Sequence, residues 1–500
     1  MTDLLLRDAR IVPLAPAAVV PTSPVDVLVS GGVVTAVGTG LSRPAGVEEV
    51  AADGRWLTPG LWDQHTHLGQ WTLSRQRVDT LGVTSPEDAV ALVARLVEEA
   101  PGRPVIGWGH RPGGWTREVT VSELDDVSGV TPVVLIAGDG HHAWLNSAAL
   151  AALGLGARDE VVRETEWFAA YELLNRLTGD DGLSPSAYRS SLVDAAAMGV
   201  VGVVDLEFAG GVTEWRERWA AGCDLLRVRV ATYADGLEDV IAAGHRTGDR
   251  LVDGDDRLAM GPLKIISDGS LNTRTAWCCE PYADGGTGAA NLAAHELSAL
   301  HARAHMSGLH VATHAIGDAA VTAALDSYAA TGALGSIEHA QLIARDDIAR
   351  LARLGLRGSV QPAHLLDDRD LTERIWPGRS DRSFAFRSML DAGVRLSLGS
   401  DAPVSPLDPW LAVAAAVHRG VLDDDRDAWH PEQSLTPQEA LAASVDDQPT
   451  VGVRSRGDLV LLDDDPLVPG AASSREAATA LRHTSVALTV VGGRVVHRAL

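Results

Sequence analysis

The middle of this chain alternates short apolar segments of strand length with longer stretches of helical pattern. Eight segments read as buried strands, at residues 61–67, 200–205, 228–233, 263–267, 310–314, 336–339, 358–361 and 395–400. Helical patterns such as 293–305, 319–331 and 346–354 lie between them. Eight strands with intervening helices predict a (β/α)8 TIM barrel, in which functional residues gather at the carboxyl ends of the strands.

The strands are regularly spaced except after the first one. The first segment ends at residue 67 and the second begins at residue 200, whereas one strand-helix unit needs only a few tens of residues. Residues 70–190 are therefore predicted to form an insertion within a barrel that spans 58–449. The insertion has its own helical pattern at 86–100, and it follows a strand end, where barrel enzymes build substrate pockets.

Both ends of the chain carry short apolar or alternating segments separated by glycine and proline. They lie at 4–12, 26–29, 33–37 and 47–51, and again at 458–462 and 487–491 before a Gly492-Gly493 hairpin turn. Two strand-rich ends around a mixed middle predict one small β-sandwich domain made of residues 1–57 and 450–500. The predicted fold class is α/β, with barrel, insertion and terminal β-domain.

Composition limits the partners of the chain. A formal charge of −25 argues against nucleic acid and membrane surfaces, because both repel an acidic protein. The three cysteines, two of them adjacent, form no disulfide framework and suit a reducing compartment. No apolar run reaches the ~18 residues of a membrane span, and the N-terminal segment is too polar for a signal peptide. We therefore expect a cytoplasmic protein with a small-molecule substrate.

Lys264 is the only lysine among the 42 lysine and arginine residues. A partly desolvated lysine amine can lose its proton and react, whereas a guanidinium group stays protonated. Lys264 lies in a segment that reads as a buried strand with a polar end, so we predict a reactive amine; the alternative is an ordinary buried ion pair. Asp268, four residues on, either orients substrate or pairs with Arg274.

Residues of the types that bind metals close several predicted strands. The first strand ends in His65-Thr66-His67, and residues i and i+2 of an extended strand point to the same side, so both imidazoles can reach one ion. Later strands carry Lys264, His314, His339 and Asp401. The alternative is that these are buried, hydrogen-bonded core residues. Core packing does not explain such a set at the ends of several strands.

Longer motifs surround these residues. They are Thr58-Pro-Gly-Leu-Trp-Asp-Gln-His-Thr-His67, Lys264-Ile-Ile-Ser-Asp-Gly-Ser270, His314-Ala-Ile-Gly-Asp318, Glu338-His-Ala-Gln341 and Gly399-Ser-Asp-Ala-Pro403. With the strand-rich ends, they make nearly the whole chain resemble the metal-dependent amidohydrolase superfamily. The YtcJ-like subgroup, which includes N-substituted formamide deformylases, is the most similar. The stretch 150–184 is shorter than in that subgroup, which leaves the substrate open.

The resemblance implies a centre of two divalent metal ions. Zinc is the first expectation, and manganese, iron or cobalt also accept this ligand set. His65 and His67 would hold the more buried ion, and His314 and His339 the second. Lys264, carboxylated by carbon dioxide on its uncharged amine, would bridge the two ions as a carbamate. Asp401 would bind one ion and shuttle a proton.

The implied reaction is hydrolysis of an amide-type C–N bond in a small molecule, for example an N-substituted formamide. A hydroxide shared by ions about 3.5–4 Å apart would attack the carbonyl group, and Asp401 would pass a proton to the departing nitrogen. The alternatives are a cyclic amide or amidine hydrolase, a deaminase, and a scaffold without catalysis. The resemblance and the size of the barrel also favour a homodimer.

Four further residues are candidates for contact with substrate. His141, in the insertion, is favoured by the resemblance. Trp108 and Trp115 belong to a glycine-rich loop that either lines the pocket or packs the insertion. Gln361 closes the seventh predicted strand and either contacts substrate or makes structural hydrogen bonds.

Overall fold

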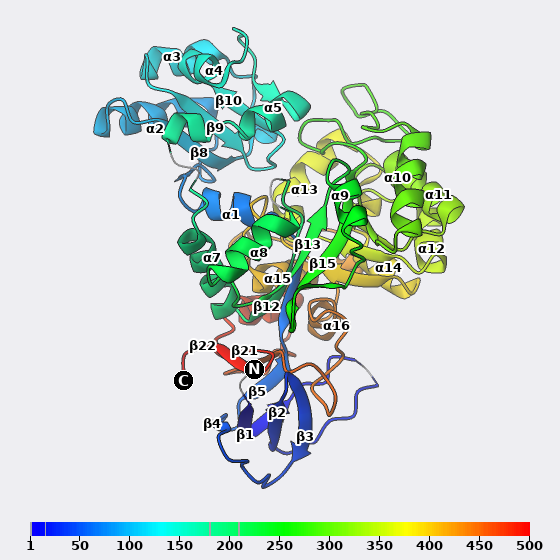
Figure 1. Cartoon of the computed structure of the whole chain (residues 1–500). Coiled ribbons are helices and arrows are strands. Elements are labelled where there is room, and N and C mark those ends of the chain that lie inside the picture. Colours follow the sequence, from blue (N-terminus) through cyan, green and yellow to red (C-terminus); the bar gives the residue numbers. More distant parts are fainter. Residues whose placement is uncertain (1–2, 16, 180–181, 209–210) are drawn as a thin grey trace.

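The computed structural model describes residues 3–15, 17–179, 182–208 and 211–500. At its centre, eight parallel strands follow one another in the order β6, β12, β13, β15, β16, β17, β18 and β19 (Figure 1). Their bounds are Leu61–Thr66, Val200–Asp205, Arg227–Thr232, Asp255–Ile266, Val311–Ala315, Gly335–His339, Arg357–Val360 and Arg395–Leu398. The predicted (β/α)8 barrel is confirmed. Only β15 differs much from its predicted bounds, because its first half also pairs with the antiparallel β14 (Arg250–Val252).

Helices surround the barrel strands. They are α7 (Pro185–Ala197), α8 (Val212–Ala220), α9 (Leu237–Ala242), α10 (Ala294–Met306), α11 (Asp318–Thr331), α12 (Arg345–Arg353), α13 (His364–Ile375), α14 (Phe386–Asp391), α15 (Pro409–His418) and α16 (Pro437–Ala442). In the described ranges, no helix is both long and apolar enough to cross a membrane.

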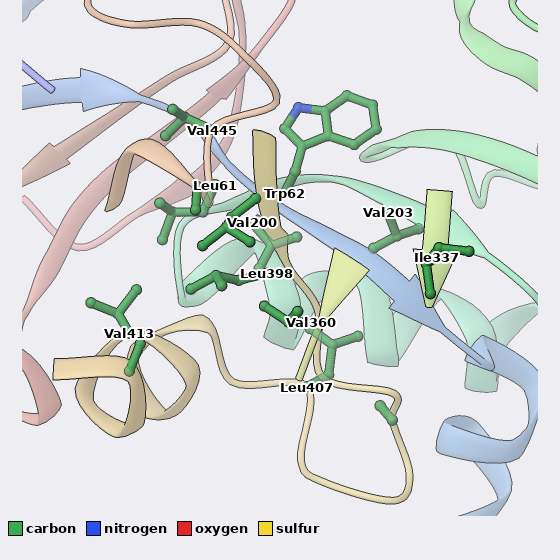
Figure 2. Close-up of a cluster of buried hydrophobic side chains, with 14 of the residues drawn as sticks. Leu61, Trp62, Val200, Val203, Ile337, Val360, Leu398, Leu407, Val413 and Val445 are labelled. Atoms are coloured by element: carbon green, nitrogen blue, oxygen red, sulfur yellow. The ribbon is translucent and has the colours of Figure 1, made fainter. Parts of the chain in front are cut away.

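The main apolar core packs the barrel strands and the helices against each other. Figure 2 shows part of it, where Leu61 of β6, Val200 of β12 and Leu398 of β19 gather near Val413 of α15. Each fully buried aliphatic side chain of this kind contributes about 1.5–3 kcal/mol relative to an exposed one. The core therefore holds the strands, and the side chains at their ends, in fixed positions.

The barrel closes where the segment after its last strand meets its first strand. The Asp401 amide donates to the His65 carbonyl oxygen at 2.7 Å, and the His67 amide donates to the Ala402 carbonyl oxygen at 2.9 Å. Gly399 lies at a close approach in this seam, because a Cβ atom there would lie 2.8 Å from both Cβ and N of His65. The seam sets the backbone of His65 and His67 relative to that of Asp401.

Strands from both ends of the chain form one sheet beneath the barrel (Figure 1), in the order β22, β21, β20, β5, β1, β2 and β3, with β4 also paired to β1. Leu4, Val27, Leu459 and Leu488 belong to its separate apolar core. The bounds are Leu4–Ile11 (β1), Val25–Ser30 (β2), Val33–Gly38 (β3), Glu48–Ala51 (β4), Trp56–Pro59 (β5), Leu459–Leu462 (β20), Val486–Val491 (β21) and Arg494–Arg498 (β22), with α17 at Ser474–Arg482.

The chain between β6 and β12 begins with α1 (Leu68–Ser74) and then forms a separate layered unit above the barrel (Figure 1). Its sheet has the order β11, β10, β9, β8, β7. Val134 and Ile136 of β9 belong to one apolar cluster, and Val133 and Leu135 to another, so both faces of the sheet are covered. The bounds are Val78–Asp79 (β7), Val105–His110 (β8), Val133–Ala137 (β9), His142–Leu145 (β10), Val162–Arg163 (β11), Pro86–Glu99 (α2), Val121–Ser128 (α3), Ser147–Leu153 (α4), Glu164–Tyr171 (α5) and Asn175–Thr178 (α6).

Substitution of Gly399 by alanine tests the closing seam. The added methyl group would press on His65 at 2.8 Å, so Gly399→Ala should destabilise the protein by about 1–3 kcal/mol, seen as a Tm lower by a few degrees. Gly156→Ala is the matched control, since Gly156 is exposed and nothing lies within 4 Å of a Cβ atom there. Equal Tm values for the two variants would contradict the close contact.

Candidate metal centre

The ends of β6 and β17 and the segment after β19 bring three buried side chains together. His65, His339 and Asp401 each offer a ligand atom, and these atoms all lie within 4.8 Å of one another. Oδ1 of Asp401 is 3.3 Å from Nε2 of His65 and 3.3 Å from Nε2 of His67. Imidazole nitrogens around a carboxylate oxygen form a donor set that divalent transition metals accept.

The Lys264 amine lies in the same group. Its Nζ atom is 3.2 Å from Nε2 of His65, and the residue is 2% exposed. Burial lowers the pKa of Lys264, although the carboxylates of Glu338 and Asp401 act in the opposite direction. A lowered pKa increases the share of uncharged amine, which is the nucleophilic form.

Two residues of the group have left-handed backbone conformations. The φ angle is +70° at His339 and +57° at Asp401, and such angles in residues other than glycine are concentrated at functional sites. At the end of β17 the left-handed backbone of His339 breaks the alternation of side chains along the strand, so Glu338 and His339 both face His65. Oε2 of Glu338 is 2.7 Å from Nδ1 of His65, and the rings of His65 and His339 are 5.0 Å apart.

His314 joins the group from β16. Its ring centroid is 4.6 Å from that of His339. Burial lowers the pKa of both imidazoles well below the ordinary value, which keeps them neutral, as a metal ligand must be. Nδ1 of His67 and Nδ1 of His339 are buried without a hydrogen-bond partner in the part of the chain that the structure describes. Buried nitrogens without partners fit a site that binds metal ions.

Asp268 lies behind His314 and is fully buried. Its carboxylate accepts hydrogen bonds from the backbone amides of Trp277, Ile316 and Gly317 at 2.9, 3.0 and 2.9 Å, and Nε2 of His314 is 3.5 Å from its Oδ1. The predicted ion pair with Arg274 is wrong, and a contact of Asp268 with substrate stays a prediction. Asp268 organises the loop around a candidate ligand and does not line the cavity, while Arg274 pairs with Asp284.

Two residues of the insertion reach the mouth of the barrel. Nε1 of Trp108 donates to the Pro403 carbonyl oxygen at 3.2 Å, and both Trp108 and His141 line a cavity of about 50 Å³ at the candidate ligands. Nδ1 of His141 is 3.0 Å from Oε2 of Glu164. Burial alone would lower the pKa of His141, but the Glu164 carboxylate, with Asp139 and Asp401, raises it to about 9. His141 is therefore a cation at neutral pH.

The other two candidates for substrate contact are not among the residues that line this cavity. Trp115 stacks on His110 with ring centroids 5.2 Å apart and packs within the insertion. Gln361 lies beside the candidate ligands, where its Nε2 is 3.4 Å from Nδ1 of His65 and 3.4 Å from the Ser359 carbonyl oxygen. The contacts of Trp115 therefore fit the alternative in which it packs the insertion. Those of Gln361 fit the alternative in which it makes structural hydrogen bonds.

Comparison with known proteins decides the family of this chain. The model of the amidohydrolase family matches residues 48–497. This chain belongs to the amidohydrolase family.

Individual relatives support the same assignment for this amidohydrolase. The Arabidopsis thaliana protein named LONG AFTER FAR-RED 3 is 31% identical over 442 residues, 80% of this chain and 74% of that protein. The N-substituted formamide deformylase of Arthrobacter pascens is 26% identical over 508 residues, 88% of this chain and 90% of that enzyme. A crystal structure of an uncharacterized metal-dependent hydrolase from Pyrococcus horikoshii OT3 has a TM-score of 0.75 and 26% identity, and the match covers 93% and 98% of the two chains.

The family and the relatives confirm the predicted resemblance to YtcJ-like amidohydrolases. They also show the general activity: the protein is a hydrolase that acts on amide-type C–N bonds. Metal dependence is a property of the family, and the His65, His339 and Asp401 group supplies a site for it.

Sequence reasoning missed two carboxylates of the amidohydrolase site. Glu338 bonds to Nδ1 of His65, which directs Nε2 of that ring towards Lys264 and Asp401, as carboxylates do behind metal-binding histidines. Oδ1 of Asp63 accepts from the amides of His65 and Ser400 at 3.1 and 2.9 Å. A signal for Asp63 existed, because it stands two residues before His65 on the same face of the strand.

The charge on His141 can be tested directly in this amidohydrolase. Replacing Glu164 with glutamine removes the largest contribution that raises the pKa of His141 to about 9. Asp139 and Asp401 remain, but burial then acts against a smaller opposing charge, so the pKa of the ring should fall well below its wild-type value. A smaller share of His141 should then be protonated at pH 7.5 than in the wild type. NMR titration of the imidazole signals, assigned with His141→Gln, measures this change.

The control is Glu160→Gln, which removes an exposed carboxylate from the same region of the insertion. It should leave the His141 titration unchanged. A His141 signal that still titrates near pH 9 in Glu164→Gln would show that the ion pair does not set its charge.

Proposed function

We propose that this amidohydrolase removes a small acyl group, such as formyl, from a substituted nitrogen, with two divalent metal ions and a carboxylated Lys264 at its centre. The observation that carries the proposal is the position of the only lysine. Its buried amine lies 3.2 Å from Nε2 of His65, within the cluster of candidate ligands. The deformylase of Arthrobacter pascens, similar over most of its length, supports the substrate class.

In this proposal each ligand has a defined place. His65 and His67, both close to Oδ1 of Asp401, would hold one ion, and the adjacent imidazoles of His314 and His339 would hold the other. Lys264 would contribute as a carbamate, because an uncharged amine takes up carbon dioxide and a guanidinium group does not. Zinc suits imidazole, carboxylate and carbamate donors.

The ions, when bound, supply polarisation of the amide carbonyl group and a lowered pKa for water. The chain supplies the groups that move protons and orient substrate. Burial opposes ionisation of Asp401, but His65 and His67 hold its pKa well below the ordinary value, so Asp401 is ionised at neutral pH, as a metal ligand must be. We assign to the same carboxylate the transfer of a proton to the departing nitrogen. His141, protonated at neutral pH, faces the same cavity and can hydrogen-bond to the substrate oxygen.

Substitution of Lys264 by arginine tests whether a positive charge is enough at this position or an amine that can form a carbamate is needed. Lys264→Arg keeps a positive charge but cannot form a carbamate, so bound metal should fall from about two ions per chain to one or fewer, and turnover should fall at least about 1,000-fold. Elemental analysis of the purified protein and a formate-release assay measure the two effects. A variant that keeps both ions and its activity would refute the bridging role.

Metal removal tests the activity itself. Protein treated with a chelator should lose hydrolysis of N-methylformamide, and addition of Zn²⁺ should restore it, because polarisation of the carbonyl group requires the ions. Circular dichroism before and after chelation checks that the protein stays folded. Formate release that persists in protein without detectable metal would rule out the proposed mechanism.

A further inference from the structure

A cavity of about 970 Å³ lies between the insertion and the barrel, beside the metal centre. Its wall on the barrel side comes from α1 and from Glu207 and Phe208 after β12, and its other walls come from α2, β8, α5 and α6 of the insertion. Apolar and aromatic side chains such as Leu73, Ile106, Tyr171 and Leu174 line much of it. Charged side chains also line it, namely Arg77, Glu99, Arg103, Glu172 and Glu207. Pockets of this size and character bind organic groups of ten or more atoms.

The large cavity adjoins the cavity at the candidate ligands. The 50 Å³ cavity at the candidate ligands shares four lining residues with it, namely Gln70, Gly140, Phe168 and Phe208. The ring of Phe208 stacks on His67 at 5.1 Å and on Phe168 at 5.7 Å. The two phenylalanine rings thus form the border between a candidate metal ligand and the large cavity.

A second small cavity at the candidate ligands is polar and, among the residues that the structure describes, shares no lining residue with the large cavity. Its volume is about 40 Å³, and it is lined by the ligands His339 and Asp401 and by polar side chains that include Arg111, Asp139 and Asn272. This volume has room for a group of only a few atoms. The 50 Å³ cavity shares lining residues with both of the others, so the candidate ligands adjoin a small polar space and a large, partly apolar one.

We propose that the large cavity binds a bulky, mostly apolar substituent on the amide nitrogen of the substrate, while the small acyl group occupies the polar side. The proposal rests on the proposed function and names its substrate class: N-arylalkyl or N-alkyl formamides. Apolar contact in a cavity discriminates strongly, because a single methylene group can change kcat/KM by about 10-fold or more.

Two isomeric amides test which half of the substrate enters the large cavity. N-(2-phenylethyl)formamide carries the phenylethyl group on nitrogen, and 3-phenylpropanamide carries it on the carbonyl carbon. Zinc-loaded protein should hydrolyse the first with kcat/KM at least about 100-fold above those for the second and for N-methylformamide. The product 2-phenylethylamine should also inhibit more strongly than methylamine.

The outcomes separate this inference from the function on which it rests. Equal kcat/KM values for the phenylethyl and methyl formamides, or a preference for 3-phenylpropanamide, would overturn the inference while amide hydrolysis stands. Failure to hydrolyse any formamide in the metal-loaded enzyme would overturn the proposed function, and this inference with it.

A cavity-filling variant tests whether the phenylethyl group binds in the large cavity. In Leu73→Trp the larger side chain takes up space in the cavity, so the ratio of kcat/KM for the phenylethyl formamide to that for the methyl formamide should fall at least about 10-fold, and inhibition by 2-phenylethylamine should weaken. The matched control is Leu334→Trp, because Leu334 is 53% exposed and lies after α11, outside the insertion. If the ratio of the two kcat/KM values is the same in Leu73→Trp as in Leu334→Trp, the phenylethyl group binds outside this cavity.

Discussion

The candidate metal centre depends on the seam that closes the barrel between β6 and the segment after β19. Two backbone hydrogen bonds join these segments, from Asp401 to His65 and from His67 to Ala402. The buried carboxylate of Asp63 adds a third connection, because it accepts from amides on both sides of the seam. Burial raises the pKa of Asp63 to about 7, which shows how strongly this carboxylate is withdrawn from water. The ligands of the first strand and Asp401 keep their mutual distance because the seam holds.

Burial also controls the charges at the centre. It favours the neutral form of Lys264, His314 and His339, while the two carboxylates Glu338 and Asp401 have lowered pKa values and stay ionised. Neutral nitrogens and ionised oxygens are the forms that bind metal ions. One physical cause, the withdrawal of the site from water, therefore prepares most of the ligand set before a metal arrives.

The barrel and the residues at its strand ends were predictable because each depends on a local pattern. Apolar segments of strand length mark the strands, and parallel strands of a barrel bring their carboxyl ends to one face. The place of Glu338 was not predictable, because alternation in a strand directs successive residues to opposite sides, and only the left-handed backbone at His339 reverses that. Asp268 and Gln361 lie beside the candidate ligands His314 and His65, but the sequence does not tell which side of a ligand a neighbour occupies. The walls of the large cavity, such as Leu73 and Leu174, come from distant segments that only the folded chain brings together.

The burial of Lys264 has a practical consequence for the chemistry of the whole surface. Because the only lysine side chain is 2% exposed, no lysine amine is available to reagents that modify amines on the folded protein. Active-ester dyes and aldehyde cross-linkers should react at the terminal amine alone, giving uniformly labelled molecules. When the protein unfolds, the Lys264 amine becomes accessible, so uptake of a second label per chain would report exposure of the candidate metal centre.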